Sequence, residues 1–203
     1  MLVLLETRMA EHKRLTEVLK FDSQIQSVAQ GLSGEIVIMW KRDLLKLDDI
    51  TFTLQSIHVI IQVIPDSKPW YFSAIYTSSD FHTRTNIWEE LINFSKSHKG
   101  DWIVGEDFNE ILKASEKFRG RCINNSRSNL FRQCLDHYNL IDLGFKGCKY
   151  TWTNKRYKNR LDPILERLDR CAANNSWILG YPHCTVTHFP RTKSDHYPLQ
   201  VRH

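Results

Sequence analysis

The stretch W-I-V-G-E-D-F-N-E, residues 102–110, decides both the fold and the site that we expect. Its first three residues are apolar, which is typical of a short buried strand, and Asp107 and Asn109 follow where that strand ends. A carboxylate and an amide two residues apart on a strand point the same way, and their oxygens suit a hard cation and a phosphate group. The alternative is a strand-to-loop turn in which Asp107 only caps the backbone.

A second polar segment, T-K-S-D-H-Y-P, lies near the C-terminus at residues 192–198. It places Asp195 beside His196, and an imidazole is the usual side chain for proton transfer near neutral pH. The alternative is a purely structural pair of aspartate and histidine. The segment therefore adds a candidate acid or base to the carboxylate and amide of the first.

Two further acids follow apolar residues. In E-R-L-D-R, residues 166–170, Asp169 is placed to orient an imidazole, although a surface helix start with paired Glu and Arg explains the same letters. In L-L-E-T-R, residues 4–8, Glu6 ends an apolar run, where a carboxylate is costly unless it binds a cation. Hydrolysis of a phosphodiester needs such a set: carboxylates for Mg²⁺, a group that prepares water, and donors for the developing charge.

Around these segments, short apolar runs alternate with amphipathic stretches, which predicts a sheet-containing α/β fold. Strands are expected at residues 2–5, 35–40, 51–64, 70–76, 102–104, 150–153 and 184–189. Helices are expected at residues 7–20, 83–98 and 127–138. A chain of 203 residues is long enough for one such domain with a real core, so we expect a single domain.

Composition limits the classes of partner. The formal net charge of +5 favours polyanions weakly, and the basic run at residues 155–160 lies among aromatic residues, as in a loop that grips a nucleic-acid strand. A solvated basic surface is the plainer explanation. The five widely spaced cysteines predict neither disulfides nor a zinc ribbon, so a reducing compartment, nucleus or cytoplasm, fits better than secretion. The five apolar residues at the N-terminus are too few for a membrane span.

In this order and wording, the motifs resemble the endonuclease/exonuclease/phosphatase superfamily, and within it the nuclease domains of plant LINE-type (non-LTR) retrotransposons. Seven segments carry the resemblance along almost the whole chain: L-L-E-T-R, G-L-S-G-E-I-V-I-M-W, Y-F-S-A-I-Y, W-I-V-G-E-D-F-N-E-I-L, L-I-D-L-G-F-K-G-C-K-Y-T-W-T-N, E-R-L-D-R and S-D-H-Y-P-L. The resemblance implies a four-layer α/β-sandwich, with two packed mixed sheets flanked by helices and the site at their mouth.

The resemblance also implies a role for each candidate residue. Glu6 would be a metal ligand, with Asp195 supporting the metal or the water, and the cation would be Mg²⁺ or alternatively Mn²⁺. Asp169 would orient His196, and either His196 or Asp107 would be the base. The remaining contacts would fall on the phosphate or its neighbours: Tyr76, Asn109, Thr151 and Ser194.

The chain departs from the family pattern at several positions. We expect that a first strand bearing a metal-supporting Asn is lost, because nothing before Glu6 supplies it. Glu106 and Glu35 both stand where glycine is usual, and Glu106 puts a negative side chain beside the expected site. These departures are typical of a decaying retroelement copy.

The resulting hypothesis is a Mg²⁺-dependent phosphodiesterase that nicks DNA and acts as a monomer without a membrane partner. The alternative from another class is a catalytically decayed remnant that still binds nucleic acid. A third keeps the fold and changes the substrate to another phosphoester, because a fold does not fix a substrate.

Overall fold

A computed structural model describes residues 1–27, 35–65, 67–155 and 163–203, with the side chains of residues 49, 50 and 106 left aside. The chain divides into two compact units, residues 1–105 and 106–203, and each is described by itself. The prediction of one domain stays a prediction.

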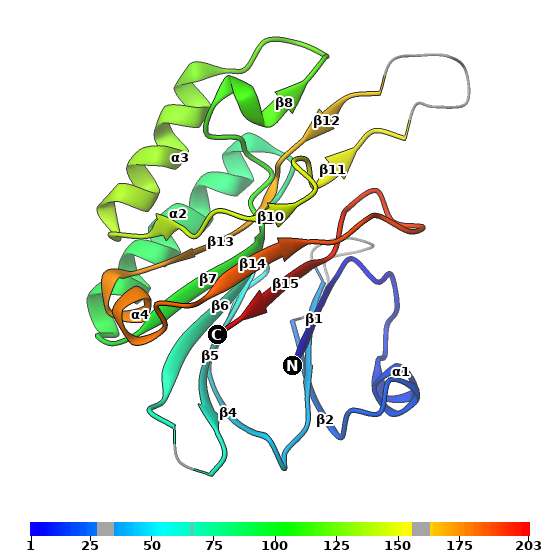
Figure 1. Ribbon diagram of the computed structural model, residues 1–203, viewed down its shortest axis with the longest axis vertical. Helices are drawn as coiled ribbons and strands as arrows, with labels where there is room; N and C mark the ends of the chain where they lie inside the picture. The colour runs from blue at the N-terminus through cyan, green and yellow to red at the C-terminus, as the bar shows by residue number, and fades with distance from the viewer. Residues whose placement is uncertain (28–34, 66, 156–162) are drawn as a thin grey trace. The chain divides into compact units, whose positions relative to one another are not determined.

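The first unit combines antiparallel strands with two helices. Its elements are β1 (Leu2–Leu5), α1 (Lys13–Val18), β2 (Ser23–Gln26), β3 (Ile36–Trp40), β4 (Leu45–Phe52), β5 (Ser56–Val63), β6 (Trp70–Tyr76), α2 (Phe81–Ser97) and β7 (Trp102–Asp107), whose last two residues belong to the second unit. One sheet has the order β1-β3-β2, and β4, β5, β6 and β7 are neighbours in another, where β4 to β6 form an antiparallel meander (Figure 1).

The core of this unit follows from apolar residues on its central strands. The side chains of Ile36, Val37, Ile38 and Met39 on β3 have no exposed surface, and α2 buries one apolar face through Ile87, Trp88, Leu91 and Phe94. Asp80 caps α2, because its carboxylate accepts a hydrogen bond from the backbone N–H of Thr83 at 2.9 Å.

The second unit has shorter elements. They are a 3-10 turn at Ala114–Glu116, β8 (Lys117–Phe118), α3 (Asn125–His137), β9 (Ile141–Asp142), β10 (Lys146–Gly147), β11 (Trp152–Thr153), β12 (Leu165–Glu166), β13 (Asp169–Ala173), α4 (Asn175–Gly180), β14 (Thr185–His188) and β15 (Leu199–Arg202). Strands β11, β12 and β8 form one antiparallel group, β13 pairs with β9, and β14 pairs with β10 and with β15 near the C-terminus (Figure 1).

Two predicted elements were wrong in their limits. The expected strand at residues 51–64 is two strands, because the chain turns at residues 53–55, where Thr53 N donates to Ser56 O at 2.9 Å. The expected helix at residues 7–20 is only α1, because the chain before it forms a turn with left-handed φ angles at Glu6 and Arg8. Elsewhere the predicted strands and helices fall within a few residues of the observed ones. Among the described residues, no helix combines the length and the apolar character needed to cross a bilayer.

Candidate active site

The turn after β7 fixes the first pair of polar side chains. Asp107 is the last residue of β7 and is buried, and its two carboxylate oxygens accept hydrogen bonds from the backbone N–H of Asn109 at 2.8 Å and from Asn109 Nδ2 at 3.0 Å. Asn109 has a φ of 45°, a left-handed conformation that asparagine tolerates better than most residues. The turn that we kept as an alternative is therefore present, and it holds the Asp107 carboxylate in one orientation.

The hydrogen bond expected between Asp169 and His196 is present. His196 Nδ1 lies 3.0 and 2.9 Å from the two carboxylate oxygens of Asp169, the first residue of the buried strand β13. Phe108 N donates to Leu168 O at 3.2 Å, which brings the end of β7 beside the start of β13. The expected alternative of a surface helix at residues 166–170 is wrong.

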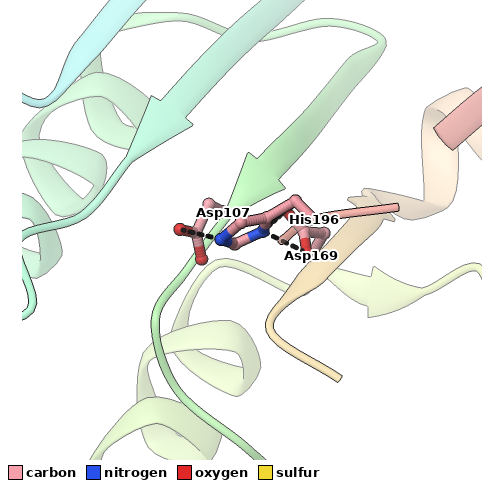
Figure 2. A group of neighbouring side chains, drawn as sticks. All are labelled: Asp107, Asp169 and His196. Atoms are coloured by element: carbon pink, nitrogen blue, oxygen red, sulfur yellow. Dashed lines mark hydrogen bonds and ion pairs between the residues drawn. The ribbon is translucent and has the colours of Figure 1, made fainter. Parts of the chain in front are cut away.

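The imidazole of His196 lies between two carboxylates, as Figure 2 shows. Its Nε2 is 3.9 Å from Asp107 Oδ2, on the side opposite to Asp169. Ligand atoms of these three residues all lie within 4.8 Å of one another. The carboxylates are nearly buried, whereas 27% of the His196 side-chain surface is exposed, so solvent reaches the imidazole.

This environment favours the protonated form of His196. Burial alone lowers the pKa of the imidazole, but the hydrogen bond and charge of Asp169, followed by the charges of Asp107 and Asp195, outweigh burial and raise the pKa to about 9. At neutral pH the group is therefore an imidazolium, which can donate a hydrogen bond or stabilise negative charge.

Two distant segments pair to place His196. Thr153 N donates to Asp195 O at 3.1 Å and Tyr197 N donates to Thr151 O at 2.8 Å, so the two segments run antiparallel. The Thr151 hydroxyl accepts from the backbone N–H groups of Leu168 and Asp169, both at 3.0 Å. Thr151 is fully buried and fixes the backbone that carries Asp169, while its expected contact with a phosphate stays a prediction.

The two residues before His196 are more exposed. The hydroxyl of the exposed Ser194 accepts a hydrogen bond from the backbone N–H of His196 at 3.0 Å, while its expected contact with a substrate stays a prediction. Asp195 Oδ1 lies 3.3 Å from Lys155 Nζ, and both side chains are about half exposed. Burial raises the pKa of Asp195, but a backbone hydrogen bond, Lys155 and the charge of His196 together lower it, so the carboxylate is charged at neutral pH.

Glu6 and Tyr76 belong to the first unit, and the Tyr76 hydroxyl donates a hydrogen bond to the Glu6 carboxylate. The other seven candidate residues belong to the second unit. The hydrogen bonds and ion pairs just described link the segments that carry all seven: Asp107, Asn109, Thr151, Asp169, Ser194, Asp195 and His196. That Glu6 and Tyr76 complete the same site stays a prediction.

The donor chemistry fits a hard divalent cation at the carboxylates. Mg²⁺ prefers oxygen ligands. Glu6 offers an exposed carboxylate in the first unit, and Asp195 offers a half-exposed one in the second. A metal needs the neutral imidazole, so His196 would have to lose the proton that the two flanking carboxylates favour before it could bind a cation. The roles of Glu6 and Asp195 as cation ligands stay predictions.

One set of charged residues escaped the sequence reasoning. Arg170 and Arg167, which flank Asp169, are almost fully buried, and each contacts the carboxylates of Glu116 and Asp142 at 2.8–3.1 Å through its closest pairs. The partners lie tens of residues away along the chain, so no local pattern could reveal them. Their ion pairs fix strand β13 and thereby the position of Asp169. The side chain of Glu106 and most of the basic run at residues 155–160 lie outside the described residues.

Comparison with known proteins identifies solved structures that have a similar fold. No family model and no curated protein matches the chain. Among solved structures, the endonuclease domain of TRAS1, a telomere-specific non-LTR retrotransposon, is similar with a TM-score of 0.66 and 18% identity over 87% of this chain and 77% of that one. D. rerio TDP2, complexed with a single-strand DNA product, is similar with a TM-score of 0.58 and 17% identity over 96% and 80%.

The third similar structure is that of an enzyme whose name indicates sphingomyelin as its substrate. Sphingomyelinase C from Streptomyces griseocarneus has a TM-score of 0.54 and 14% identity over 84% of this chain and 68% of that one. At these identities the likeness concerns the fold alone. The predicted fold class is confirmed: the chain has the mixed α/β fold of the endonuclease/exonuclease/phosphatase type.

Proposed function

We propose that the chain is a Mg²⁺-dependent endonuclease domain that hydrolyses phosphodiester bonds of DNA and derives from a plant LINE-type retrotransposon. The fold likeness to a retrotransposon endonuclease domain and to TDP2 supports this proposal, and so do the seven sequence segments. Mn²⁺ is the other cation that the same oxygen ligands would accept.

The observation that carries the proposal is the position of His196. Its Nδ1 is held by Asp169 at 2.9 Å, its Nε2 lies 3.9 Å from Asp107 Oδ2, and its side chain is partly exposed. A histidine that serves only the core is typically buried, as His58 is, whereas 27% of the His196 side-chain surface is exposed. Here a carboxylate orients the ring through Nδ1, and Nε2 lies beyond hydrogen-bond distance of Asp107.

The residues of the chain divide the chemistry as follows. The imidazolium of His196 donates from Nε2 to a phosphate oxygen and stabilises the charge that develops there. The bond from phosphorus to the leaving oxygen breaks, and that oxygen takes up a proton from solvent. Asp107, fixed by Asn109, accepts a proton from the attacking water. A cation held at Glu6 in the first unit, or at Asp195 in the second, would supply Lewis-acid charge to a phosphate when bound.

DNA is the proposed substrate, because the net charge of +5 favours a polyanion and TDP2 was solved with a DNA product. Since sphingomyelinase C shares the fold, a panel of substrates is the direct test. Cleavage of DNA but not of sphingomyelin or of a simple phosphomonoester is the expected result.

The activity itself is tested by nicking of supercoiled plasmid in Mg²⁺. We expect nicking by the wild-type chain, its loss on adding EDTA, and its loss in the His196→Ala and Asp107→Ala variants. The exposed His183 and Asp136 provide matched controls, because His183→Ala and Asp136→Ala remove the same groups away from the site. Nicking that persists in His196→Ala at the wild-type rate would contradict the proposal.

The ion pair between Asp195 and Lys155 favours a second candidate, a folded domain that binds nucleic acid without cleaving it. Lys155 already neutralises one of the carboxylates expected to hold the cation. This candidate predicts salt-sensitive DNA binding that is unchanged in His196→Ala, with no nicking by any variant.

A further inference from the structure

Glu35, which the sequence marked as a departure from glycine, is part of a buried hydrogen-bond network in the first unit. The side chain of His12 is 0% exposed and that of Glu35 is 4% exposed, and His12 Nε2 lies 3.0 Å from Glu35 Oε1. His12 Nδ1 lies 2.9 Å from Gln26 Oε1 on the neighbouring strand β2. A buried carboxylate is costly when unpartnered, and here every oxygen of Glu35 has a partner, because Thr7 binds the other one.

Thr7 links this network to the turn that carries Glu6. The Thr7 hydroxyl donates to Glu35 Oε2 at 2.7 Å and lies 2.5 Å from His12 Nε2. Its two neighbours, Glu6 and Arg8, have φ angles of 49° and 58°, which side chains other than glycine rarely adopt. Thr7 is therefore the anchored residue in the middle of a turn that would not persist without its contacts.

Glu35 also holds Glu6 directly through the backbone. Glu6 N donates to Glu35 O at 3.0 Å, and the Glu6 carboxylate accepts from the Tyr76 hydroxyl. Glu6 is thus fixed at both its backbone and its carboxylate, although its side chain is exposed. An exposed glutamate with no binding role would gain nothing from being held in this way, since surface carboxylates are solvated in many rotamers.

We infer that Glu35, acting with His12 through Thr7, is a positioning residue that presents the Glu6 carboxylate to a divalent cation. The inference rests on the proposed function, because it takes Glu6 as a cation ligand. On this inference, Glu35 is not a sign of decay, because its buried carboxylate is fully hydrogen-bonded and helps to position Glu6. Partners that orient a metal ligand in this way typically contribute about 10–100-fold to metal affinity.

The first arm of the test uses the metal-free chain, so that it does not depend on activity. The carboxyl ¹³C shift of Glu6 reports its hydrogen bond to Tyr76, with Tyr76→Phe as the reference for its loss. In Thr7→Val and in Glu35→Gln, we expect the Glu6 carboxyl shift to match that of Tyr76→Phe. In Thr7→Ser, which keeps the hydroxyl, the Glu6 shift should match that of the wild type. Exposed Glu17 on α1 supplies the control Glu17→Gln. A wild-type Glu6 shift in Thr7→Val would overturn the inference.

The second arm measures Mg²⁺ binding by titration calorimetry on the same variants. We expect Thr7→Val to weaken binding by about tenfold, as for other residues that orient a ligand, and Thr7→Ser to bind as the wild type does. If Thr7→Val lowers the melting temperature but binds Mg²⁺ as tightly as the wild type, the network is only structural and the inference is overturned. If Glu6→Gln itself leaves Mg²⁺ binding unchanged, the failure lies in the proposed function, because Glu6 is then no ligand.

Discussion

His58 and His196 each lie within hydrogen-bond distance of a carboxylate, at 2.8 Å from Glu90 and 2.9 Å from Asp169, yet their surroundings differ. The side chain of His58 is 0% exposed, whereas that of His196 is 27% exposed. His58 Nδ1 lies 2.6 Å from the Ser73 hydroxyl. Both ring nitrogens of His58 are therefore used inside the first unit, while Nε2 of His196 faces Asp107 at 3.9 Å.

The difference separates a core histidine from a candidate for chemistry. The His58 ring stacks on Phe94 with centroids 4.3 Å apart, and Ser56 lies 3.0 Å from its Nε2. A serine, a histidine and a carboxylate in contact have the composition of a nucleophilic site, but no substrate reaches a fully buried ring. A pair of histidine and carboxylate is thus informative only together with its exposure and the engagement of its second nitrogen.

The largest expected effect is on the nicking rate, which should separate His196 from His58. His196→Ala should lower the rate of plasmid nicking by about 10²–10⁴-fold, because the positioned proton donor is lost. His58→Gln, measured per folded molecule, should nick close to the wild-type rate, since His58 contacts no substrate. Equal losses in both variants would mean that His196 is structural in the same sense as His58.

The next effect concerns the free energy of unfolding, which should depend more on His58 than on His196. His58→Ala removes one buried hydrogen-bond partner from each of Glu90 and Ser73, so the free energy of unfolding should fall by roughly 2–4 kcal/mol. Chemical denaturation followed by circular dichroism measures this change. A matched exposed change, His183→Ala, should alter stability by less than about 0.5 kcal/mol. A similarly small loss in His58→Ala would show that the buried network contributes little.

The sequence located His196 but not His58 for a physical reason. His196 lies beside Asp195 in a compact polar segment after Thr192, whereas the partners of His58 are 32 and 15 residues away. Local spacing reveals groups that one turn brings together, as with Asp107 and Asn109. It does not reveal pairings that tertiary packing creates: the resemblance supplied the pair of Asp169 and His196, and nothing supplied those of Arg170 with Glu116.

The same limit explains the errors in the fold. Periodicity predicted β6 at residues 70–76, because its apolar run is bounded by polar residues at both ends. Periodicity merged the end of β4 with β5, because the turn between them, residues 53–55, contains no proline or glycine. The short strand β13 was missed because its buried Arg170 is of a residue type typical of the surface, and only its ion pairs make burial possible.

The pH dependence of stability sharpens the comparison next. The pKa of folded His196 is about 9, above the usual value of 6.5, so the folded chain binds a proton more tightly than the unfolded chain. The resulting stabilisation is complete below about pH 6.5 and is lost as the pH rises through about 9, by roughly 3 kcal/mol in total. Denaturation measured from pH 6 to 10 should show this fall in the wild type and a much smaller one in Asp169→Asn. A flat profile in the wild type would contradict the charge assignment at His196.

The smallest expected effect concerns the exposed pair of Lys155 and Asp195, which tests whether the site differs from an ordinary surface. Both side chains are about half exposed, so Lys155→Gln should change the free energy of unfolding by less than about 1 kcal/mol. The pKa of Asp195 should rise towards its usual value, because Lys155 helps to lower it, and carboxyl NMR titration measures that rise. The same substitution should strengthen Mg²⁺ binding if Asp195 is a cation ligand, because the ammonium group competes with the metal for the carboxylate. Weaker Mg²⁺ binding in Lys155→Gln would mean that Lys155 helps to arrange Asp195, and the ion pair would then belong to the site.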